Sequence, residues 1–473
     1  MDSVELLATS KNSYLVAPAG CGKTHLIAEA VAKHSGRREL ILTHTHAGVD
    51  ALRRKLRIFH ARTSSFRVET IASWALQYAA AFPKNSGQLT QYPRTEQEWK
   101  KTYAACAALL RSRPIREIVR ASYSGLYVDE YQDCTVEQHE IICQLSEILP
   151  CRILGDPLQG IFDFGSNQPI IWQTHVEPRF EKLPPLSTPW RWAQTAPALG
   201  EWLFKMREDL LGQKQIDLKF APNPDVTWVQ LPKDRTPRYM AQVQALRATA
   251  KKDGTIVAIL KWERECNGFV QQLAPVYNNV ETVECKELDG AASEIEKSTG
   301  IERMEAVLAF ASECLTGINA SMKTAVGVLR KRGLRKSRTY TRQLQIDLLE
   351  NVIDSQSLSP VLAALDGLKE IPGTKVWRKE LFYDMRRALR ELSTGQYEDL
   401  QSAAWAVRNK SRHSERKLGS RIISRTLLVK GLQFDHCLIL HAESLSIKEL
   451  YVALTRGART LTILSENRIL KPQ

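Results

Sequence analysis

Short apolar runs alternate with amphipathic helical stretches over the first 185 residues. The runs are rich in β-branched and aromatic residues, and they lie at residues 13–19, 39–45, 66–70, 126–130 and 151–156. Between the last two runs, Ile141, Ile142, Leu145, Ile148 and Leu149 recur at helical spacing. Alternation of strands and helices is typical of a mostly parallel sheet with helices on both faces. The pattern therefore predicts an α/β domain.

A second set of apolar runs follows the proline-rich segment KLPPLSTP, at residues 226–231, 255–260, 437–440 and 461–464. The stretches 74–123 and 285–417 are helical in pattern and contain few β-rich runs. We therefore expect two α/β domains with parallel sheets, each carrying a mostly helical insertion. The predicted first domain is 1–73 plus 124–185 with the insertion 74–123, and the second is 186–284 plus 418–473 with the insertion 285–417.

Basic residues outnumber acidic ones, 66 to 52, which gives a formal net charge of +14. Such an excess favours a polyanionic partner. Residues 321–346 hold eight basic residues and no acid, so this segment carries more than half of the net charge. A solvated helical face is the general explanation of a charge run, but we favour nucleic-acid contact here. The residues predicted to bind DNA in this segment are Arg330, Lys331, Arg332, Arg335 and Lys336.

A second basic cluster is open between the same two interpretations. Its members are Arg408, Lys410, Arg412, Arg416, Lys417 and Arg421.

The nine cysteines are scattered, include no CxxC pair and are odd in number. This argues against a disulfide framework, a zinc site or an iron–sulfur cluster, and it favours a reducing compartment. His44 and His46 share one face of a predicted strand, but no third ligand lies at suitable spacing, so we expect no metal there. No apolar run approaches the ~18 residues of a membrane span, and the first ten residues do not resemble a signal peptide. We expect a cytoplasmic protein without membrane contact.

The segment APAGCGKT at residues 17–24 follows an apolar strand and opens a helix, as a P-loop does. Gly20 and Gly22 let the backbone curl around phosphate oxygens, together with Ala19 and Cys21. Lys23 can reach the β and γ phosphates, and Thr24 can hold Mg²⁺. The segment therefore predicts ATP and Mg²⁺ as cofactors.

LYVDEYQD at residues 126–133 is an apolar strand that ends in two acids. An ordinary acidic turn would explain this run if it stood alone. Behind a P-loop, Asp129 can anchor Mg²⁺, and Glu130 can orient and deprotonate the attacking water. The two segments together predict nucleotide hydrolysis.

With these motifs the chain resembles the UvrD/Rep-like branch of superfamily 1 DNA helicases, in which the second motif reads DExQD. GDPLQGIFDF (155–164) is similar to the third motif, which implies that Gln159 senses the γ-phosphate and that Phe162 and Phe164 face the DNA bases. LSTPWRW (186–192) resembles the fourth motif, which implies that Arg191 stabilises charge on the transferring phosphoryl group. The flanking Trp190 and Trp192 are predicted to be core aromatics.

The remaining motifs follow in the order of the family. TLLVKGLQFD (426–435) resembles the fifth motif, which implies nucleotide binding by Gly431 and Gln433. ELYVALTRGAR (449–459) resembles the sixth motif, which implies that Arg456, like Arg191, is an arginine finger that stabilises charge on the transferring phosphoryl group. THTHAG (43–48) and VETIAS (68–73) resemble the motifs that imply DNA contact by Thr45 and Thr70. The resemblance implies two RecA-like P-loop domains that hydrolyse ATP on DNA.

Several positions depart from the pattern of the family. No glutamine precedes the P-loop to recognise adenine, and Gln433 replaces the usual glutamate. Gly165, His46 and Ala72 stand where Arg, Asn and His are usual. We therefore expect intact ATPase chemistry beside altered contacts to the base and the strand.

The function that these features imply is an ATP-dependent DNA translocase or helicase acting on single-stranded or tailed DNA, moving 3′ to 5′. The alternative is an ATP-gated DNA-sensing subunit of an antiviral defence or repair complex, with little unwinding of its own. The layout is similar to the helicase-like subunit of Gabija-type defence systems. The chain ends 17 residues after Arg456, so we expect any nuclease to be a separate protein partner.

Overall fold

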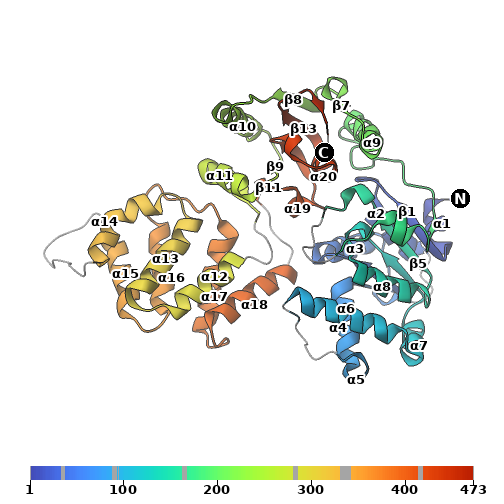
Figure 1. Ribbon diagram of the computed structural model, residues 1–473, viewed down its shortest axis with the longest axis horizontal. Helices are drawn as coiled ribbons and strands as arrows, with labels where there is room; N and C mark the ends of the chain where they lie inside the picture. Colours follow the sequence, from blue (N-terminus) through green and yellow to red (C-terminus); the bar gives the residue numbers. More distant parts are fainter. Residues whose placement is uncertain are drawn as a thin grey trace. The chain divides into compact units, whose positions relative to one another are not determined.

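The computed structural model describes residues 2–33, 38–87, 93, 95–161, 168–280, 286–330, 342–413 and 419–471. The chain divides into two compact units. Unit 1 comprises Met1–Leu231 and Lys430–Gln473, and unit 2 comprises Pro232–Val429 (Figure 1). Within the described ranges, no helix combines the length and the apolar character that a membrane span requires.

Unit 1 contains a six-stranded parallel sheet in the order β3-β2-β4-β5-β1-β6. Its strands are β1 (Asn12–Val16), β2 (Glu39–Thr43), β3 (Phe66–Thr70), β4 (Gly125–Val128), β5 (Cys151–Gly155) and β6 (Glu181–Lys182). Strands β2, β4 and β5 are buried along their whole length. Burial on both faces explains why these runs are mostly apolar rather than alternating. The buried charges within them, Glu39 and Arg152, lie 4.0 Å apart as an ion pair.

Each face of this sheet has its own hydrophobic core, because successive side chains of a strand point to opposite faces. Leu40 and Leu42 of β2 pack with α4, α6, α7 and α8, whereas Ile41 packs with α1, α2 and α3. The helices of the first core are α4 (Ile71–Ala81), α6 (Glu96–Leu110), α7 (Arg113–Ser122) and α8 (Val136–Ser146), with the short α5 (Pro83–Ser86) beside α4 and α6. Those of the second core are α1 (Ser3–Thr9), α2 (Lys23–Lys33) and α3 (His46–Ile58).

The remaining elements of unit 1 lie between Pro197 and Leu231 and in the segment that begins at Lys430. Strands β12, β13 and β8 are parallel and adjacent in that order, and β14 pairs antiparallel with β7. The elements are α9 (Pro197–Leu211), β7 (Ile216–Asp217), β8 (Val226–Gln230), β12 (Phe434–Ile439), α20 (Ile447–Leu454), β13 (Gly457–Ser465) and β14 (Ile469–Leu470).

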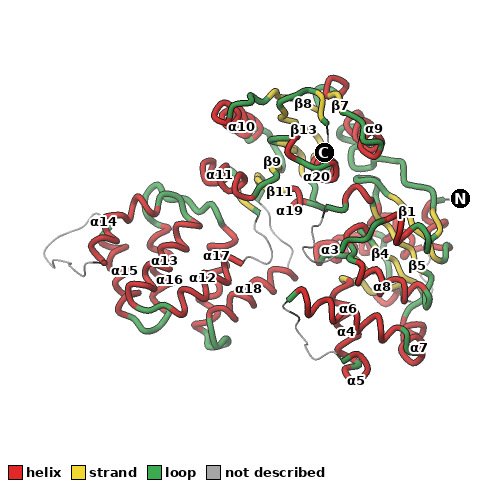
Figure 2. The backbone as a smooth tube through the Cα atoms, in the orientation of Figure 1, coloured by secondary structure: helices red, strands yellow, loops and turns green. Residues whose placement is uncertain are grey.

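Unit 2 combines parallel strands with a large helical segment. Strands β10 (Asn278–Asn279), β11 (Arg421–Arg425) and β9 (Ile256–Leu260) are parallel in that order, and α10 (Arg235–Thr249), α11 (Glu263–Leu273) and α19 (Thr426–Val429) accompany them. Figure 2 shows the segment between β10 and β11 as helices joined by loops. These helices are α12 (Lys286–Lys297), α13 (Gly300–Cys314), α14 (Ile318–Arg330), α15 (Gln343–Asp354), α16 (Ser359–Lys369), α17 (Lys379–Ser393) and α18 (Leu400–His413), which share one apolar core.

The fold class predicted from the sequence is confirmed: the protein is α/β, with two RecA-like parallel sheets and mostly helical insertions. All nine predicted strands are present, although β2 ends at Thr43 rather than at residue 45. Strand β11 was not predicted, because only Ile422 and Ile423 are apolar within RIISR. The domain boundaries stay a prediction.

Candidate nucleotide-binding site

The loop between β1 and α2 has the backbone geometry of a phosphate cradle. Gly20 and Gly22 have φ angles of 76° and 85°, in the left-handed region that favours glycine. A Cβ atom on Gly20 would lie 2.5 Å from Cζ3 of Trp192, so the loop also requires glycine for space. Cys21, between the two glycines, is buried. Ala19 donates its backbone N–H to the hydroxyl of Tyr451 at 3.1 Å.

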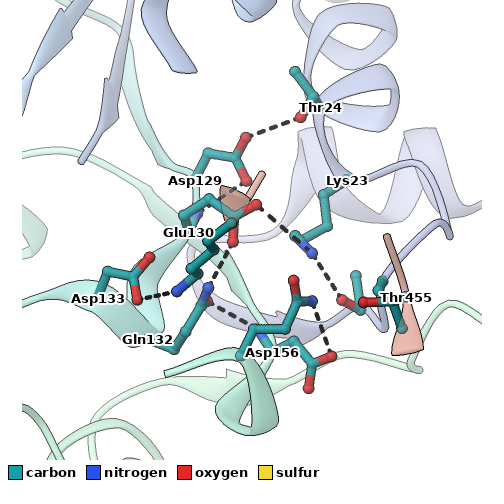
Figure 3. Close-up of polar contacts among 12 residues, drawn as sticks. Lys23, Thr24, Asp129, Glu130, Gln132, Asp133, Asp156 and Thr455 are labelled. Atoms are coloured by element: carbon teal, nitrogen blue, oxygen red, sulfur yellow. Dashed lines mark hydrogen bonds and ion pairs between the residues drawn. The ribbon is translucent and has the colours of Figure 1, made fainter. Parts of the chain in front are cut away.

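Lys23 is the first residue of α2, and its side chain is buried. Its Nζ donates a hydrogen bond to the carbonyl of Ala17 at 3.1 Å and lies 3.9 Å from Oε1 of Glu130 (Figure 3). The ammonium group is therefore held at the P-loop between a backbone acceptor and the predicted catalytic carboxylate.

Thr24 and Asp129 meet across the site. The Thr24 hydroxyl donates to Oδ2 of Asp129 at 3.1 Å (Figure 3). Asp129 follows β4, and its backbone N–H bonds the carbonyl of Leu42 on β2, which fixes the position of the carboxylate. Burial raises the pKa of Asp129 to about 7, and the charge of Glu130 adds to this shift. A buried carboxylate beside a hydroxyl is an oxygen donor set that suits Mg²⁺.

Glu130 adopts φ 55° and ψ 42°, a left-handed conformation that costs a non-glycine residue about 1 to 3 kcal/mol. Its Oε2 accepts a hydrogen bond from Nε2 of Gln132 at 2.6 Å. Burial acts to raise the pKa of Glu130, but the positive charges of Lys23 and Lys430 outweigh it, and the pKa is lowered. This carboxylate is therefore ionised at neutral pH and ready to accept a proton.

Gln159 is anchored on a buried carboxylate. Its Nε2 donates to Oδ2 of Asp156 at 3.1 Å, and the Asp156 backbone N–H bonds Oε1 of Gln132. Nη2 of Arg207, on α9, lies 2.9 Å from Oδ1 of Asp156. The sequence analysis singled out Gln159 but neither Asp156 nor Arg207, because no local pattern links a helix residue to an acid 51 positions away.

Arg191 packs directly on the P-loop. Its backbone N–H bonds the carbonyl of Gly20 at 3.1 Å, and Nη1 donates to the carbonyl of Thr455 at 2.5 Å. Its guanidinium carbon lies 5.4 Å from the ring centroid of Trp192. Burial lowers the pKa of Arg191. This backbone hydrogen bond places the segment LSTPWRW, which contains Arg191, against the P-loop.

Arg456 is almost completely buried, and its guanidinium donates hydrogen bonds to nearby backbone carbonyls. It donates to the carbonyls of Val452 and Leu432 at 2.8 and 2.9 Å. Burial lowers its pKa to about 9, and the like charge of Arg191 adds to the shift. In the part of the chain that the structure describes, neither arginine forms an ion pair with a carboxylate. Two buried guanidiniums that repel each other favour a bound anion between them.

Lys430 extends the charge network of the LYVDEYQD segment. Its Nζ donates a hydrogen bond to Oδ1 of Asp133, and both side chains are buried (Figure 3). Burial raises the pKa of Asp133 to about 7 and lowers that of Lys430. Lys430 lies in the motif TLLVKGLQFD and Asp133 in LYVDEYQD, so the sequence marked each residue as part of the site. The ion pair between them was not predicted. Gly431 and Gln433 lie exposed in the loop that follows.

The predicted DNA-binding threonines lie at the carboxyl edge of the unit 1 sheet, and both cap helices. The Thr45 hydroxyl accepts from the backbone N–H of Gly48 at 3.1 Å, and that of Thr70 from Ser73 at 3.0 Å. Thr43 and Thr70 are register partners on β2 and β3, so the two helix starts lie beside each other. Phe162 and Phe164 fall outside the described residues.

Four of the five predicted DNA-binding residues of the first basic segment, Lys331, Arg332, Arg335 and Lys336, lie outside the described residues. Arg330 is exposed and pairs with Glu305 at 2.7 Å. In the second cluster, Arg408 is buried and pairs with Asp384 at 3.1 Å. Arg408 is therefore held by the fold of the helical segment.

Two interpretations from the sequence are wrong. Trp192 is buried, but the Trp190 side chain is 67% exposed, and its Cδ1 lies 3.5 Å from where a Cβ on Gly22 would be. Trp190 is therefore a surface aromatic beside the P-loop. His44 and His46 do not share a strand face, because β2 ends at Thr43 and His46 begins α3.

Comparison with known proteins gives one family match. Residues 93–176, which contain the DEYQD segment, match the UvrD/REP helicase N-terminal domain, and this confirms the predicted resemblance. No curated protein sequence matches the chain.

Solved structures similar to the chain are helicases of low sequence identity. Pif1 helicase from Bacteroides, in complex with ADP-AlF3 and ssDNA, is 11% identical with a TM-score of 0.37, and the match covers 100% of this chain and 94% of that chain. Pif1 helicase from Candida albicans is 11% identical with a TM-score of 0.36, covering 99% and 95%. Arterivirus nonstructural protein 10 (helicase) with DNA is 9% identical with a TM-score of 0.35. The chain, 98% of which is covered, spans 62% of that helicase chain.

Proposed function

We propose that this protein is an ATP-driven DNA motor of the superfamily 1 helicase type, which moves 3′ to 5′ along single-stranded or tailed DNA. The observation that carries the proposal is the convergence of Lys23, Glu130, Arg191 and Arg456 on one P-loop within unit 1. The charges of Lys23 and Arg456 act on the pKa of Glu130, and the charge of Glu130 acts on the pKa values of Arg191 and Arg456. The family match over residues 93–176 supports the same conclusion.

The residues at the P-loop fit a nucleoside triphosphate. Gly20 and Gly22 leave room for a phosphate chain, and helix α2 starts immediately after them with Lys23 in its first turn. Arg191 and Arg456 contribute two buried positive charges without carboxylate partners among the described residues. Phosphate oxygens would satisfy these charges, since a buried guanidinium without an anion is unstable.

Mg²⁺ fits the pair formed by Thr24 and Asp129. A hydroxyl and a buried carboxylate lie 3.1 Å apart, and the pKa of Asp129 is raised to about 7 by burial, so a cation there would stabilise the ionised form. When bound, Mg²⁺ would neutralise charge on the phosphate oxygens.

Hydrolysis then depends on the side chains around Glu130. Its lowered pKa keeps the carboxylate ionised, so it can take a proton from the attacking water, and Gln132 fixes its orientation through Oε2. Arg191 and Arg456 would stabilise the charge that develops on the transferring phosphoryl group. Gln159 would report the state of the γ-phosphate through Asp156.

The DNA strand is proposed to run past the helix starts at Thr45 and Thr70. Ligands of open parallel sheets bind outside the carboxyl ends of the strands, which is where both threonines lie. Phosphate oxygens would meet the backbone N–H groups and hydroxyls there.

The test is ATPase activity with and without single-stranded DNA, together with strand displacement on duplexes with 3′ or 5′ tails. We expect DNA-stimulated hydrolysis and displacement of the 3′-tailed duplex, both lost in Glu130→Gln. Hydrolysis that DNA does not stimulate would contradict the motor proposal. DNA-stimulated hydrolysis without displacement would favour the alternative, a DNA-sensing regulatory subunit with a protein partner such as a nuclease. The altered positions His46 and Gln433 motivate that alternative.

A further inference from the structure

Trp262 is an exposed aromatic residue at a position in unit 2 that no recognised motif includes. It is the second residue after β9 and the N-cap of α11, and 58% of its surface is exposed. A single exposed apolar side chain needs no explanation by itself. Two further features distinguish Trp262: its position at the end of a parallel strand and the charged side chains beside it.

The residue lies at the carboxyl edge of the parallel strands of unit 2. Leu260, the last residue of β9, is the register partner of Arg425, the last residue of β11. Helix α11 begins at Glu263, three residues after the end of β9. In unit 1, Thr45 and Thr70 follow the carboxyl ends of β2 and β3 in the same manner. The two units therefore present corresponding edges, the edge at which open parallel sheets bind ligands.

Positive charge accompanies the indole. Nζ of Lys261 lies 5.2 Å from the ring centroid of Trp262, a cation–π distance. Arg425, at the end of the neighbouring strand β11, is paired with Glu263, its Nη2 lying 3.2 Å from Oε2 of that carboxylate, so Lys261 is the cation left for a phosphate. An aromatic platform beside a basic side chain is an arrangement that binds single-stranded nucleic acid, since a base stacks on the ring and a phosphate meets the cation.

We propose that Trp262 is a stacking platform for one base of single-stranded DNA, with Lys261 binding the adjacent phosphate. The inference rests on the proposed function, which supplies the strand. It goes further by assigning a DNA contact to unit 2 that the motifs do not include. A stacked base is read by its π-face alone, so the contact accepts every base, as a motor that moves along DNA requires.

The experiment measures binding of a fluorescein-labelled thymidine oligonucleotide by anisotropy. Trp262→Ala is expected to weaken binding about 5- to 150-fold, the range for loss of one base–aromatic stack. Trp262→Phe keeps a ring and should retain most of the affinity. Phe220→Ala is the matched control, because Phe220 is also an exposed aromatic (75%) but belongs to unit 1 and to none of the recognised motifs. Thermal unfolding of each variant checks its fold.

The phosphate contact has its own readout. Lys261→Gln should make the slope of log K against log salt shallower by about 0.7, the value for one contact to a single strand. Equal affinity of Trp262→Ala and the wild type would overturn the inference and leave the proposed function intact. Equal loss in the Ala and Phe variants would overturn the stacking role. Absence of DNA binding by the wild type would overturn the inference together with the proposed function.

Discussion

Nη2 of Arg207 lies 2.9 Å from Oδ1 of Asp156, whose side chain is completely buried. The same carboxylate accepts a hydrogen bond from Gln159, so one acid joins α9 to the predicted sensor of the γ-phosphate. The charge of Asp156 and its hydrogen bond to Arg207 raise the pKa of the arginine above its ordinary value, although burial opposes this. We therefore expect the pair to contribute to both stability and hydrolysis.

Removing Arg207 should affect both properties. Arg207→Gln leaves a buried carboxylate without its counter-ion, which destabilises proteins by about 3 to 5 kcal/mol. We also expect a lower kcat with little change in KM, because Gln159 loses a fixed anchor. Denaturant unfolding and steady-state ATPase assays measure the two effects. Arg207→Lys keeps the charge and should restore part of both, and an unfolding free energy equal to that of the wild type in Arg207→Gln would contradict the prediction.

Lys23→Ala and Glu130→Gln should separate nucleotide binding from hydrolysis. Lys23→Ala removes the phosphate ligand of the cradle, so nucleotide binding weakens and hydrolysis is abolished. Glu130→Gln keeps the cradle but cannot accept a proton, so binding persists while kcat falls by about 10²- to 10⁴-fold. A nucleotide titration and steady-state ATPase on both variants decide the matter. Near-normal turnover in Glu130→Gln would remove Glu130 from its catalytic role.

Binding of Mg²⁺-nucleotide should weaken as the pH falls through 7. The pKa of Asp129 in the metal-free site is raised to about 7, so the carboxyl is protonated below that pH and must lose its proton to hold the cation. We expect the Kd for a non-hydrolysable Mg²⁺-nucleotide to rise by up to about tenfold per pH unit between pH 7 and 6.

The control for this pH dependence is Asp129→Asn. Its side chain cannot ionise, so nucleotide binding should be weaker at every pH and should respond little to Mg²⁺. If the wild-type Kd were constant from pH 8 to pH 6, the carboxyl of Asp129 would still be ionised at pH 6, and its pKa would lie below that value.

Nucleotide selection should be relaxed. The first twenty residues contain no glutamine to recognise adenine, and Trp190 offers an exposed ring beside Gly22, on which any base can stack. We expect kcat/KM for ATP to exceed that for GTP by less than about a hundredfold. Parallel ATPase and GTPase assays measure the ratio. A larger ratio would mean that a polar group recognises the purine edge.

The sequence by itself determined the elements whose causes are local. Glycines in the P-loop, an apolar strand before two acids and apolar runs of the right length predicted the parallel sheets, because backbone geometry and burial leave their mark at short spacing. The residues of the phosphate site followed from the same motifs, since Lys23, Thr24, Asp129 and Glu130 adjoin strand ends that a parallel sheet brings to one edge.

Only the tertiary structure decided which charges are paired. Lys430 and Asp133 are 297 positions apart, and Arg207 and Asp156 are 51 apart, so no periodicity connects either pair. The structure also exposed Trp190 and buried Trp192, although one residue separates them. Burial of a ring and pairing of a charge depend on what the rest of the chain packs against that point, and this information is absent from the residues on either side.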